Sequence, residues 1–390
     1  MNIIIFTHPK FLAHQSMPRF AQMLKEGMKQ KGHQIIEWSP RPFFIKLAFL
    51  SKKLSKWLGY LDQYFVFPIE VSLKLIAYKK ETLFVFADNA LGPWVTLVKN
   101  RQHVVHCHDF LAQHSAFDLI PENKISQNGK YYQKFILWGY RKAENFISIS
   151  YKTQSDLHVL LETVPKVSHV VYNGLNQNFV PTQNKIALRK ILSTEYNIDL
   201  SAGFVLHVGG NAFYKNKLGV LEIYDYWSSH YSVTIPLILV GEYPETEIIA
   251  FKEKSSVSKS IHFIANTEDL RLQQFYQSAS VLLFPSLYEG FGWPIIEAMA
   301  SGCLVITTEK DPMKEVAGEA GFYIPKKPFD EAGIVNWKKI AAQELQKVIH
   351  LSPEDHCKAV EISLSQSKKF LTIDFMNAIE KIYFEILKDK

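Results

Sequence analysis

The sequence predicts an α/β protein with two domains, each built around a doubly wound parallel sheet. Short apolar runs rich in Val and Ile alternate with segments of helical periodicity along most of the chain, which is typical of parallel sheets covered by helices on both faces. This alternation pauses near residues 174–202 and then starts again. A length of 390 residues also suits two or three domains better than one.

The first domain, predicted over residues 1–173, begins at once with the strand "NIIIFT". In the next segment Phe20, Leu24 and Met28 have helical spacing, and Gly32 is placed to end the helix. Further strands are expected at "HQIIEW", "TLFVFA", "QHVVHCH", "FISIS" and "HVVYNG", and a helix at "YKTQSDLHVLLE". These elements predict a Rossmann-like domain.

A second Rossmann-like domain is predicted over residues 174–371. Its expected strands are "GFVLHVGG", "IPLILVG", "SIHFI", "SVLLFP" and "CLVITT", with helices at "LGVLEIYDYWSSH", "TEDLRLQQFYQSA" and "PIIEAMASG". The final helix, about residues 372–390, has room to pack back on the first domain. Because ligands of open α/β sheets bind beyond the carboxyl ends of the strands, the site is expected in a cleft between the two domains.

Composition narrows the class of protein. The net charge of +6 is mild and is not gathered in an Arg-rich tail, so nucleic acid is not indicated as a partner. The three cysteines are far apart, which argues against a disulfide framework or a Cys-rich zinc site. The N-terminus has no signal-peptide pattern, and no apolar run reaches eighteen residues, so we expect a cytoplasmic protein.

Residues 288–302, "YEGFGWPIIEAMASG", follow a predicted strand and should form a loop and then a helix. Pro294 suits the first turn of a helix and Gly302 its end. The N–H groups at such a helix start attract anions such as a pyrophosphate. Glu289 and Glu297 can accept hydrogen bonds from sugar hydroxyls. The residues alone leave open an ordinary Gly/Pro turn with two solvated glutamates.

This stretch resembles the Glu-x7-Glu signature of glycosyltransferase family 4, the retaining nucleotide-sugar glycosyltransferases also called glycosyl transferases group 1. Other blocks resemble the family in the same order: "ISISYKTQSDL", "VVYNGLN", "HVGGNAFYKN", "TEDLRLQQFYQSASVLLFPSLYEGFG" and "PMKEVAGEAGFYIP". The resemblance covers most of residues 105–325. It implies the GT-B fold, in which two Rossmann-like domains face each other across a cleft. Residues 1–173 would then form the acceptor domain and residues 174–371 the nucleotide-sugar donor domain.

The resemblance also implies roles for the residues of the signature. Glu297 matches the glutamate that holds the ribose hydroxyls of the donor nucleotide, and Glu289 matches the one that contacts the donor sugar. Phe291, Gly292 and Trp293 match positions whose backbone amides face the sugar or the diphosphate.

Lys215 matches the family lysine that neutralises the departing diphosphate, where a fixed cation stabilises charge that develops in the transition state. Taken alone, it could be a surface lysine in a polar loop. Gly209 and Gly210 at the preceding strand end, and Gly290 in the signature loop, are further donor-binding candidates because glycine lets the backbone approach a ligand closely.

The chain departs from the family at one point. The family usually pairs the lysine with an arginine, either directly after the glycine of the strand end or directly before the lysine. Here those positions are Gly210 and Tyr214. Lys217 and Arg19 are the candidates for a second phosphate-binding cation.

A second cluster, "VVHCHDF", places His106, His108 and Asp109 at the end of a strand. By resemblance, His108 lies close to the donor sugar and the acceptor. A buried structural histidine and a His-x-His metal pair are the alternatives for His108. Asp109 is expected to orient His108 or to cap the next helix, and Thr153 and Asp156 are assigned mainly structural roles.

The resemblance implies front-face attack by the acceptor hydroxyl, which needs no enzyme nucleophile. The sequence contains no Gly-x-Ser-x-Gly motif and no Asp-x-Asp metal clamp. We therefore expect no cofactor and no metal, with Lys215 and the helix N-terminus serving the diphosphate. Two alternatives keep the fold: a sugar-phosphate synthase or nucleotide-sugar epimerase, and a non-catalytic nucleotide-sugar-binding protein.

Residues 41–61, "RPFFIKLAFLSKKLSKWLGYL", contain five basic residues and no acidic one. Leu54, Trp57 and Leu61 recur at helical spacing, with lysines on another face. A cationic amphipathic helix suits an anionic membrane surface, while an ordinary helix with its apolar side on the core is the alternative. The expected partners are thus a UDP- or GDP-sugar, a glycan or lipid-linked acceptor and the inner membrane face, with the enzyme in bacterial surface-glycan synthesis.

Overall fold

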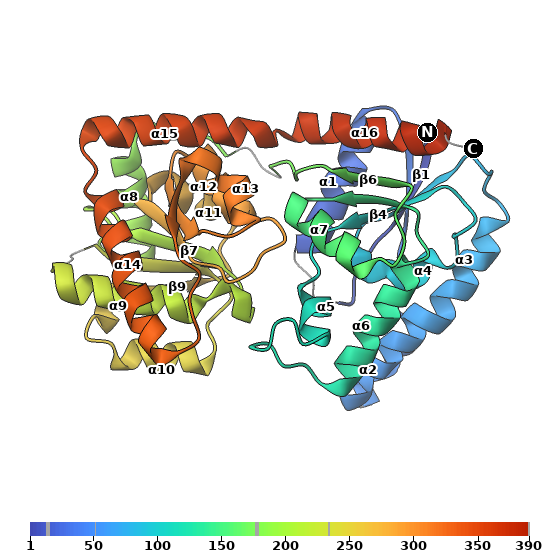
Figure 1. The fold of residues 1–390 in the computed structure, drawn as a ribbon, viewed down its shortest axis with the longest axis horizontal. Helices are drawn as coiled ribbons and strands as arrows, with labels where there is room; N and C mark the ends of the chain where they lie inside the picture. Colours follow the sequence, from blue (N-terminus) through green and yellow to red (C-terminus); the bar gives the residue numbers. More distant parts are fainter. Residues whose placement is uncertain (13–15, 51, 176–178, 233–234, 389–390) are drawn as a thin grey trace. The chain divides into compact units, whose positions relative to one another are not determined.

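The computed structural model describes residues 1–12, 16–50, 52–175, 179–232 and 235–388 (Figure 1). Contacts divide the chain into two compact units. Unit 1 contains Met1–Asn176 together with Thr372–Lys390, and unit 2 contains Gln177–Leu371. Each unit holds one six-stranded sheet in which every neighbouring pair of strands is parallel, so the predicted fold class is confirmed.

The sheet of unit 1 has the order β2-β1-β3-β4-β5-β6. Its strands are β1 (Asn2–Phe6), β2 (Gln34–Trp38), β3 (Leu83–Phe86), β4 (His103–Cys107), β5 (Asn145–Ser148) and β6 (Val167–Val170). The chain adds β2 on one side of β1 and β3 on the other. The order of the strands therefore reverses between β1 and β3, where a doubly wound sheet usually binds its ligand.

Helices cover this sheet on both faces (Figure 1). They are α1 (Ser16–Gln30), α2 (Lys52–Leu61), α3 (Phe67–Leu75), α4 (Gly92–Val95), α5 (Leu111–Ala116), α6 (Gln127–Tyr140), α7 (Tyr151–Leu160) and α16 (Thr372–Lys388). Short 3₁₀ turns η1 (Phe44–Leu50) and η3 (Asn89–Leu91) precede α2 and α4, and a π-helical turn η2 (Asp62–Val66) joins α2 to α3. The expected helix of residues 41–61 is therefore two elements, with residue 51 outside the described part.

The core of unit 1 is strongly aromatic. Phe6 stacks on Phe86 with ring centroids 4.6 Å apart, and Trp38, Phe67 and Trp94 surround them. Rings of this size bury a large apolar area at few backbone positions. This cluster lies between the sheet and the helices α3 and α4, so it fixes both helices against the ends of β1 and β3.

The sheet of unit 2 has the order β12-β11-β10-β7-β8-β9. Its strands are β7 (Val205–Gly209), β8 (Leu237–Gly241), β9 (Ile261–Ala265), β10 (Val281–Phe284), β11 (Leu304–Thr308) and β12 (Gly321–Ile324). Here the order reverses between β7 and β10. The loops that follow these two strands carry "NAFYK" and "SLYEGFG", so the topology brings the two motifs together.

The helices of unit 2 pack on both faces of its sheet. They are α8 (Lys185–Tyr196), α9 (Lys217–Tyr231), α10 (Thr246–Lys254), α11 (Asp269–Ser278), α12 (Trp293–Ala300), α13 (Met313–Ala317), α14 (Glu331–Ile349) and α15 (Pro353–Ser367). Trp227 of α9 and Trp337 of α14 lie in the core with the strand residues Leu237 and Ile306. No helix within the described residues of the chain is long and apolar enough to cross a membrane.

The last helix, α16, belongs to unit 1 and packs on α1 (Figure 1). Glu380 of α16 bonds Lys31 at 2.9 Å and His33 at 2.6 Å. Deeper in the unit, the Tyr383 hydroxyl lies 2.8 Å from Nε2 of His106 in β4. Burial lowers the pKa of His106 to about 3, so this histidine is neutral and depends on Tyr383 for its polar contact.

Tyr383→Phe tests this contact. Nδ1 of His106 has no hydrogen-bond partner among the described residues, so the variant leaves the buried imidazole without one on either nitrogen. A buried polar group that loses its partner costs about 1–3 kcal/mol, and we expect the free energy of unfolding in urea to fall by that amount. Tyr243→Phe, at an exposed tyrosine, is the matched control. Equal unfolding midpoints for the two variants would contradict the prediction.

Candidate functional site

The centre of the candidate site in unit 2 is an ion pair between the loops that follow β7 and β10. Lys215 ends the 3₁₀ turn η4 (Phe213–Lys215), and Glu289 lies in the loop before α12. The Lys215 Nζ atom lies 2.7 Å and 3.0 Å from the two carboxylate oxygens of Glu289. The side chains are only 17% and 7% exposed. Two residues that the sequence placed at one site are therefore in direct contact.

Asn216 holds this pair in place. It adopts the left-handed conformation, with φ of 55°, and caps α9 by accepting a hydrogen bond from the Gly219 N–H. Its side-chain amide also donates to the Pro285 carbonyl at 2.8 Å. Asparagine tolerates this backbone conformation better than most residues, and its side chain links the loop after β7 to the loop after β10.

The helix α12 begins beside the pair. Gly292, its N-cap, has φ of +107°, which a residue with a Cβ rarely adopts, and no side chain caps the helix. Pro294 lies in the first turn and Gly302 follows the end with φ of +70°, both as the sequence predicts. Trp293 is half-buried, and its indole N–H has no partner among the described residues.

Glu297 is buried in α12 and accepts a hydrogen bond from the Tyr276 hydroxyl of α11 at 2.8 Å. Burial, together with the charge of Glu297, raises the pKa of Tyr276 well above its usual value. The tyrosine therefore stays a hydrogen-bond donor. The two glutamates of the signature thus have different partners, Lys215 for Glu289 and Tyr276 for Glu297.

Gly210, one of the two positions where the family usually has an arginine, lies beside a carboxylate and a lysine. A Cβ at Gly210 would lie 3.2 Å from the carboxylate of Glu242, and the Asn211 N–H donates to this carboxylate at 2.9 Å. Lys217 Nζ donates to Asn211 Oδ1 at 2.7 Å and to the Glu242 carbonyl at 2.9 Å. An acidic side chain and a nearly buried lysine thus surround the position, while burial lowers the pKa of Lys217.

His207, on β7, is fully buried beside these groups. Its Nδ1 donates to the Leu283 carbonyl at 3.0 Å, and its ring stacks on Phe284. Lys215 Nζ lies 5.3 Å from the centre of the same Phe284 ring. Burial, assisted by the charges of Lys217 and Lys215 and opposed by the bond to the Leu283 carbonyl, lowers the pKa of His207 to about 4. The neutral ring therefore exposes no additional positive charge to the site.

In unit 1, His108 lies just after β4 and is buried. Its Nε2 donates to the Ala87 carbonyl at 2.9 Å, and its backbone N–H donates to Asn89 Oδ1 at 3.2 Å. Burial lowers the pKa of His108, so the neutral ring carries its proton on Nε2 and offers Nδ1 as an acceptor. Phe20 of α1 packs against the ring, with centroids 4.3 Å apart.

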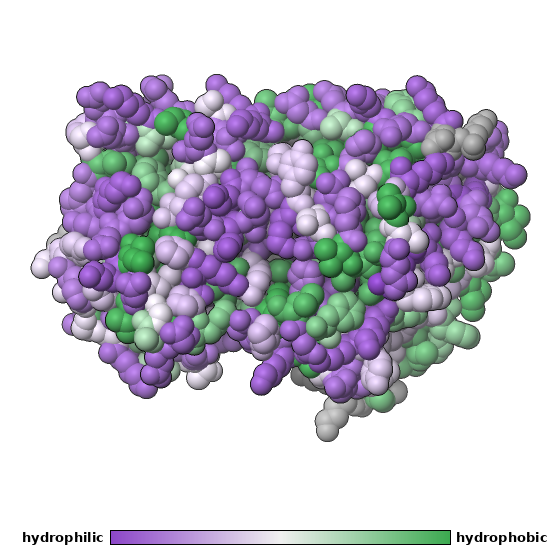
Figure 2. Space-filling model, in the orientation of Figure 1, coloured by the Kyte–Doolittle hydropathy of each residue, from purple (hydrophilic) through white to green (hydrophobic). Residues whose placement is uncertain are grey.

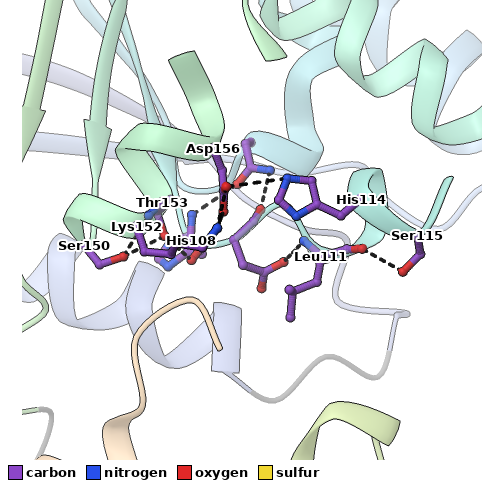
Figure 3. Close-up of polar contacts among 10 residues, drawn as sticks. His108, Leu111, His114, Ser115, Ser150, Lys152, Thr153 and Asp156 are labelled. Carbon is purple, nitrogen blue, oxygen red and sulfur yellow. Dashed lines mark hydrogen bonds and ion pairs between the residues drawn. The ribbon is translucent and has the colours of Figure 1, made fainter. Parts of the chain in front are cut away.

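The residues around His108 form a polar cluster at the ends of β4 and β5 (Figure 3). The Thr153 hydroxyl donates to the His108 carbonyl at 3.3 Å, and Ser150 caps α7 by accepting from the Thr153 N–H. Asp156 lies between Lys152 and His114 in this view. Each member of this cluster thus has a partner that holds its helix or loop in place.

Asp109 precedes Phe110, which is the N-cap of α5 and makes no side-chain capping bond. Its Oδ1 accepts a hydrogen bond from the Leu111 N–H at 3.0 Å, at the start of α5, and its carbonyl accepts from the Asn89 side chain. His106 points instead to Tyr383, so the two histidines of "HCH" have different partners. The described residues contain no group of three or more His, Cys, Asp or Glu side chains that could hold a metal ion.

Arg19 lies in α1, in the other unit from Lys215, and is exposed. Among the described residues of unit 2, Lys217 is the predicted second cation that lies near the pair. Three further residues were missed by the sequence argument: Tyr276, His207 and Glu242. Tyr276 and His207 lie inside apolar elements, so the sequence does not distinguish them from structural core residues. Glu242 follows a glycine at the end of a strand, and that position could have indicated a site residue.

His207→Asn tests the electrostatics of the site. Between its unfolded pKa of 6.5 and its folded pKa of about 4, the unfolded chain binds a proton that the folded chain does not. Through His207 alone, the free energy of unfolding is therefore highest above pH 6.5. It falls as the pH drops, by about 2 kcal/mol between pH 8 and pH 5. Asparagine can keep the bond to Leu283 without titrating, so the variant should lose about 2 kcal/mol less over this interval.

The measurement is urea unfolding at both pH values, with the exposed His350→Asn as the control. The control should follow the wild type, because the His350 side chain lies at the surface, away from the buried groups around His207. The same pH dependence in His207→Asn as in the wild type would show that His207 is not held neutral by its surroundings.

Residues 204–336, which include Lys215, Glu289 and Glu297, match the family described as glycosyl transferases group 1. Two relatives of known function are O-antigen chain mannosyltransferases. The O-antigen chain mannosyltransferase B of Escherichia coli is 31% identical over 121 residues, 30% of this chain and 32% of that protein. The O-antigen chain mannosyltransferase RfbU of Salmonella typhimurium is 25% identical over 209 residues, 52% of each chain. The chain thus spans about a third to a half of these relatives.

Solved structures resemble the whole chain. HepE of Anabaena, determined with UDP and glucose, matches 98% of this chain and 99% of its own with a TM-score of 0.68 and 15% identity. WaaG, a glycosyltransferase involved in lipopolysaccharide biosynthesis, matches the same shares with a TM-score of 0.68 and 14% identity. At this identity the likeness concerns the fold. Residues 204–336 of this chain thus match the glycosyl transferases group 1 family, and the chain has the GT-B fold.

Proposed function

We propose that the chain is a retaining glycosyltransferase. It moves a hexose or N-acetylhexosamine from a nucleoside diphosphate sugar to a glycan or lipid-linked acceptor, in the synthesis of a bacterial surface polysaccharide or glycolipid. The observation that carries this proposal is the half-buried Lys215–Glu289 pair at the reversal point of the unit 2 sheet. The relatives named above, two of them O-antigen mannosyltransferases, make a mannosyl donor the first to test.

The pair suits a sugar diphosphate because each member has a separate task. The diphosphate competes with Glu289 for the Lys215 ammonium, and the sugar hydroxyls then donate to the carboxylate that is released. Both charges keep partners in a site with little exposure, where an unpaired charge is costly. As the glycosidic bond to the phosphate breaks, Lys215 stabilises the charge that develops on the leaving group.

The rest of the unit 2 site supports the same assignment. The start of α12, with its positive dipole end and no side-chain cap, suits the negative phosphates. Glu297 is held by Tyr276 in a position to accept bonds from the ribose hydroxyls. Lys217 is the candidate for the second cation, in place of the family arginine. His108 is the candidate for contacts to the sugar or acceptor from unit 1.

Lys215→Met tests the role of the cation. Nucleotide release from a panel of UDP-, GDP- and ADP-sugars, with mannosyl donors included and EDTA present, should identify one donor for the wild type. Removing one preorganised group that stabilises the leaving charge should lower this release by about 10²–10³-fold. Glu289→Ala should also lose release, and the exposed Lys339→Met is the control.

Each other outcome has a definite meaning. Release by Lys215→Met at the rate of Lys339→Met would refute the assigned role of Lys215. Release only after a divalent ion replaces EDTA would refute metal-independent transfer. Donor binding without any release would favour a non-catalytic protein, for which Gly210 beside Glu242 is the supporting observation. A change of the donor sugar without an acceptor would favour an epimerase.

We also propose that unit 1 docks on an anionic membrane surface. The expected apolar stripe of Leu54, Trp57 and Leu61 is exposed and does not face the core. It continues through η2 and α3 with Phe65, Ile69, Leu73 and Ile76, all exposed. Hydrophobic side chains gather over α3 at the right edge of Figure 2. The side chains of Leu50, Lys52 and Lys53 lie outside the described part of the chain.

Charge favours lipid over a protein partner on this stripe. Arg41, Lys46 and Lys56 are exposed beside its first half. In its second half Glu70 is paired with Lys74 at 2.6 Å. Asp62 is buried, and its carboxylate accepts three backbone N–H bonds. An apolar ridge with a net positive border fits anionic headgroups, and each basic residue adds about 1 kcal/mol near such a surface.

Vesicle flotation tests the docking surface. The wild type should bind vesicles that contain anionic lipid roughly tenfold more than neutral vesicles, because several basic side chains lie near the surface. Trp57→Glu should reduce this binding, since it places a negative charge in the centre of the stripe. Ile186→Glu, at an equally exposed apolar residue of unit 2, is the control. Equal binding of both variants, or equal binding to both kinds of vesicle, would refute the proposal.

A further inference from the structure

A lysine from the loop after β12 covers one side of the signature loop, residues 285–292. The Nζ atom of Lys326 lies 3.6 Å from the centre of the Tyr288 ring, and Tyr288 directly precedes Glu289. A cation within about 6 Å of the centre of an aromatic ring is attracted to the ring face. This contact therefore joins the loop after β12 to the loop that carries a glutamate of the site.

The loop that carries Lys326 is itself fixed in place. Just before this lysine, the Pro325 carbonyl accepts a hydrogen bond from Trp337 Nε1 of α14 at 2.8 Å. Just after it, Lys327 Nζ lies 2.5 Å from a carboxylate oxygen of Glu222 in α9, and the two side chains are 10% and 12% exposed. Because Lys326 lies between two anchored residues, its contact with the signature loop costs little further conformational entropy.

The Tyr288 ring also contacts the turn that carries Lys215. Phe213, the first residue of η4, has its ring centre 6.2 Å from that of Tyr288, with 51° between the ring planes. Beside these rings, the Leu287 N–H donates to the Tyr214 carbonyl at 2.8 Å. Tyr288 thus connects the loop after β12 with the turn that carries the lysine of the site.

These contacts bear on the ion pair of the site. Tyr288 and Glu289 are neighbours in one loop, and Phe213 and Lys215 belong to one turn. A shift of the Tyr288 ring would move the Glu289 backbone, and with it the carboxylate that lies 2.7 Å from Lys215. A misplacement of about 1 Å can cost about 10²-fold in rate, so the support of this ring matters for the chemistry.

We infer that Lys326 is a positioning residue for sugar transfer, which acts through the Tyr288 ring to hold Glu289 in the geometry that the donor sugar needs. The inference rests on the proposed function, in which Glu289 accepts hydrogen bonds from hydroxyls of the donor sugar. It makes the loop after β12 a third part of the unit 2 site, beside the loops after β7 and β10.

A direct effect of the Lys326 charge on the diphosphate is the rival explanation. That effect needs the cation but not the ring, so Tyr288→Leu would leave it intact. In the positioning role the cation and the ring act together, so Lys326→Met, Tyr288→Leu and the double variant should be equally impaired. Lys326→Arg and Tyr288→Phe keep a cation over an aromatic ring and should keep most of the activity.

The first measurement is nucleotide release at a saturating concentration of the donor that the wild type uses. Lys326→Met and Tyr288→Leu should release about 3- to 30-fold more slowly, which is the range that one cation–π contact supplies. Calorimetry should show that both variants bind free UDP or GDP no more weakly than the wild type, because Glu289 serves the sugar. The exposed Lys339→Met and Tyr243→Leu are the controls.

Labelling of Lys215 with acetic anhydride tests the same contact without any donor. Because Glu289 pairs with the Lys215 ammonium and the lysine side chain is only 17% exposed, fast labelling requires the loop to open. Peptide mass spectrometry should show Lys215 labelled about 3- to 30-fold faster in Lys326→Met and Tyr288→Leu, since the loss of the contact raises the open population by that factor. Lys326→Arg should label as the wild type does.

Several outcomes would overturn the inference. They are unchanged release in Lys326→Met, a defect in Lys326→Met that Tyr288→Leu does not share, and weaker UDP or GDP binding together with a lower thermal unfolding midpoint. The second would assign Lys326 to the diphosphate, and the third would assign the effect to folding.

The labelling separates this inference from the proposed function. If the wild type releases no nucleotide from any donor, the transferase is refuted, and faster labelling in Lys326→Met would still support the contact as a restraint on the ion pair. Release by the wild type, with neither release nor labelling changed in Lys326→Met, refutes the positioning role and leaves the transferase.

Discussion

The reversal of strand order in each parallel sheet is the constraint on which the rest of the structure depends. In unit 2 the chain adds β8 on one side of β7 and later β10 on the other. The connections after β7 and β10 then continue to helices on opposite faces of the sheet, and the first residues of both loops line a crevice at its carboxyl edge. Lys215 and Glu289, 74 residues apart in sequence, meet there. In unit 1 the same reversal brings His8 and Asp88 together, with 2.7 Å between His8 Nε2 and Asp88 Oδ2.

Hydrogen bonds from polar side chains fix the conformation of the loops at the carboxyl edges of both sheets. Asn216 links two loops in unit 2, and Asp62 holds a 3₁₀ turn against a π-helical turn in unit 1. In both places a side chain satisfies backbone groups that no helix or sheet pairs. A site preorganised in this way loses less freedom when a ligand binds, which favours affinity.

Much of this could be predicted from the sequence because its signals are local. The apolar runs indicated the strands, and the Gly, Pro and Glu residues of the signature indicated the start of α12. What depends on distant partners could not be predicted. In the sequence, Tyr276 cannot be distinguished from an ordinary core tyrosine, and only the structure shows its bond to Glu297. Likewise, only the structure shows that the Glu242 carboxylate lies beside Gly210. The exposed apolar stripe was predicted only as far as Leu61, because the extra residue of η2 shifts the helical phase and hides the continuation into α3.

The position of α16 has a consequence for how the protein is made. Unit 1 is interrupted by the whole of unit 2 and is completed only by residues 372–388. His106 and His33 therefore lack Tyr383 and Glu380 until residues 372–388 have been synthesised, whereas unit 2 is already complete. Because domains generally fold as the chain emerges, unit 2 can finish folding first although it is second in sequence. Until then the N-terminal half lacks the helix that packs on α1 and contacts β4.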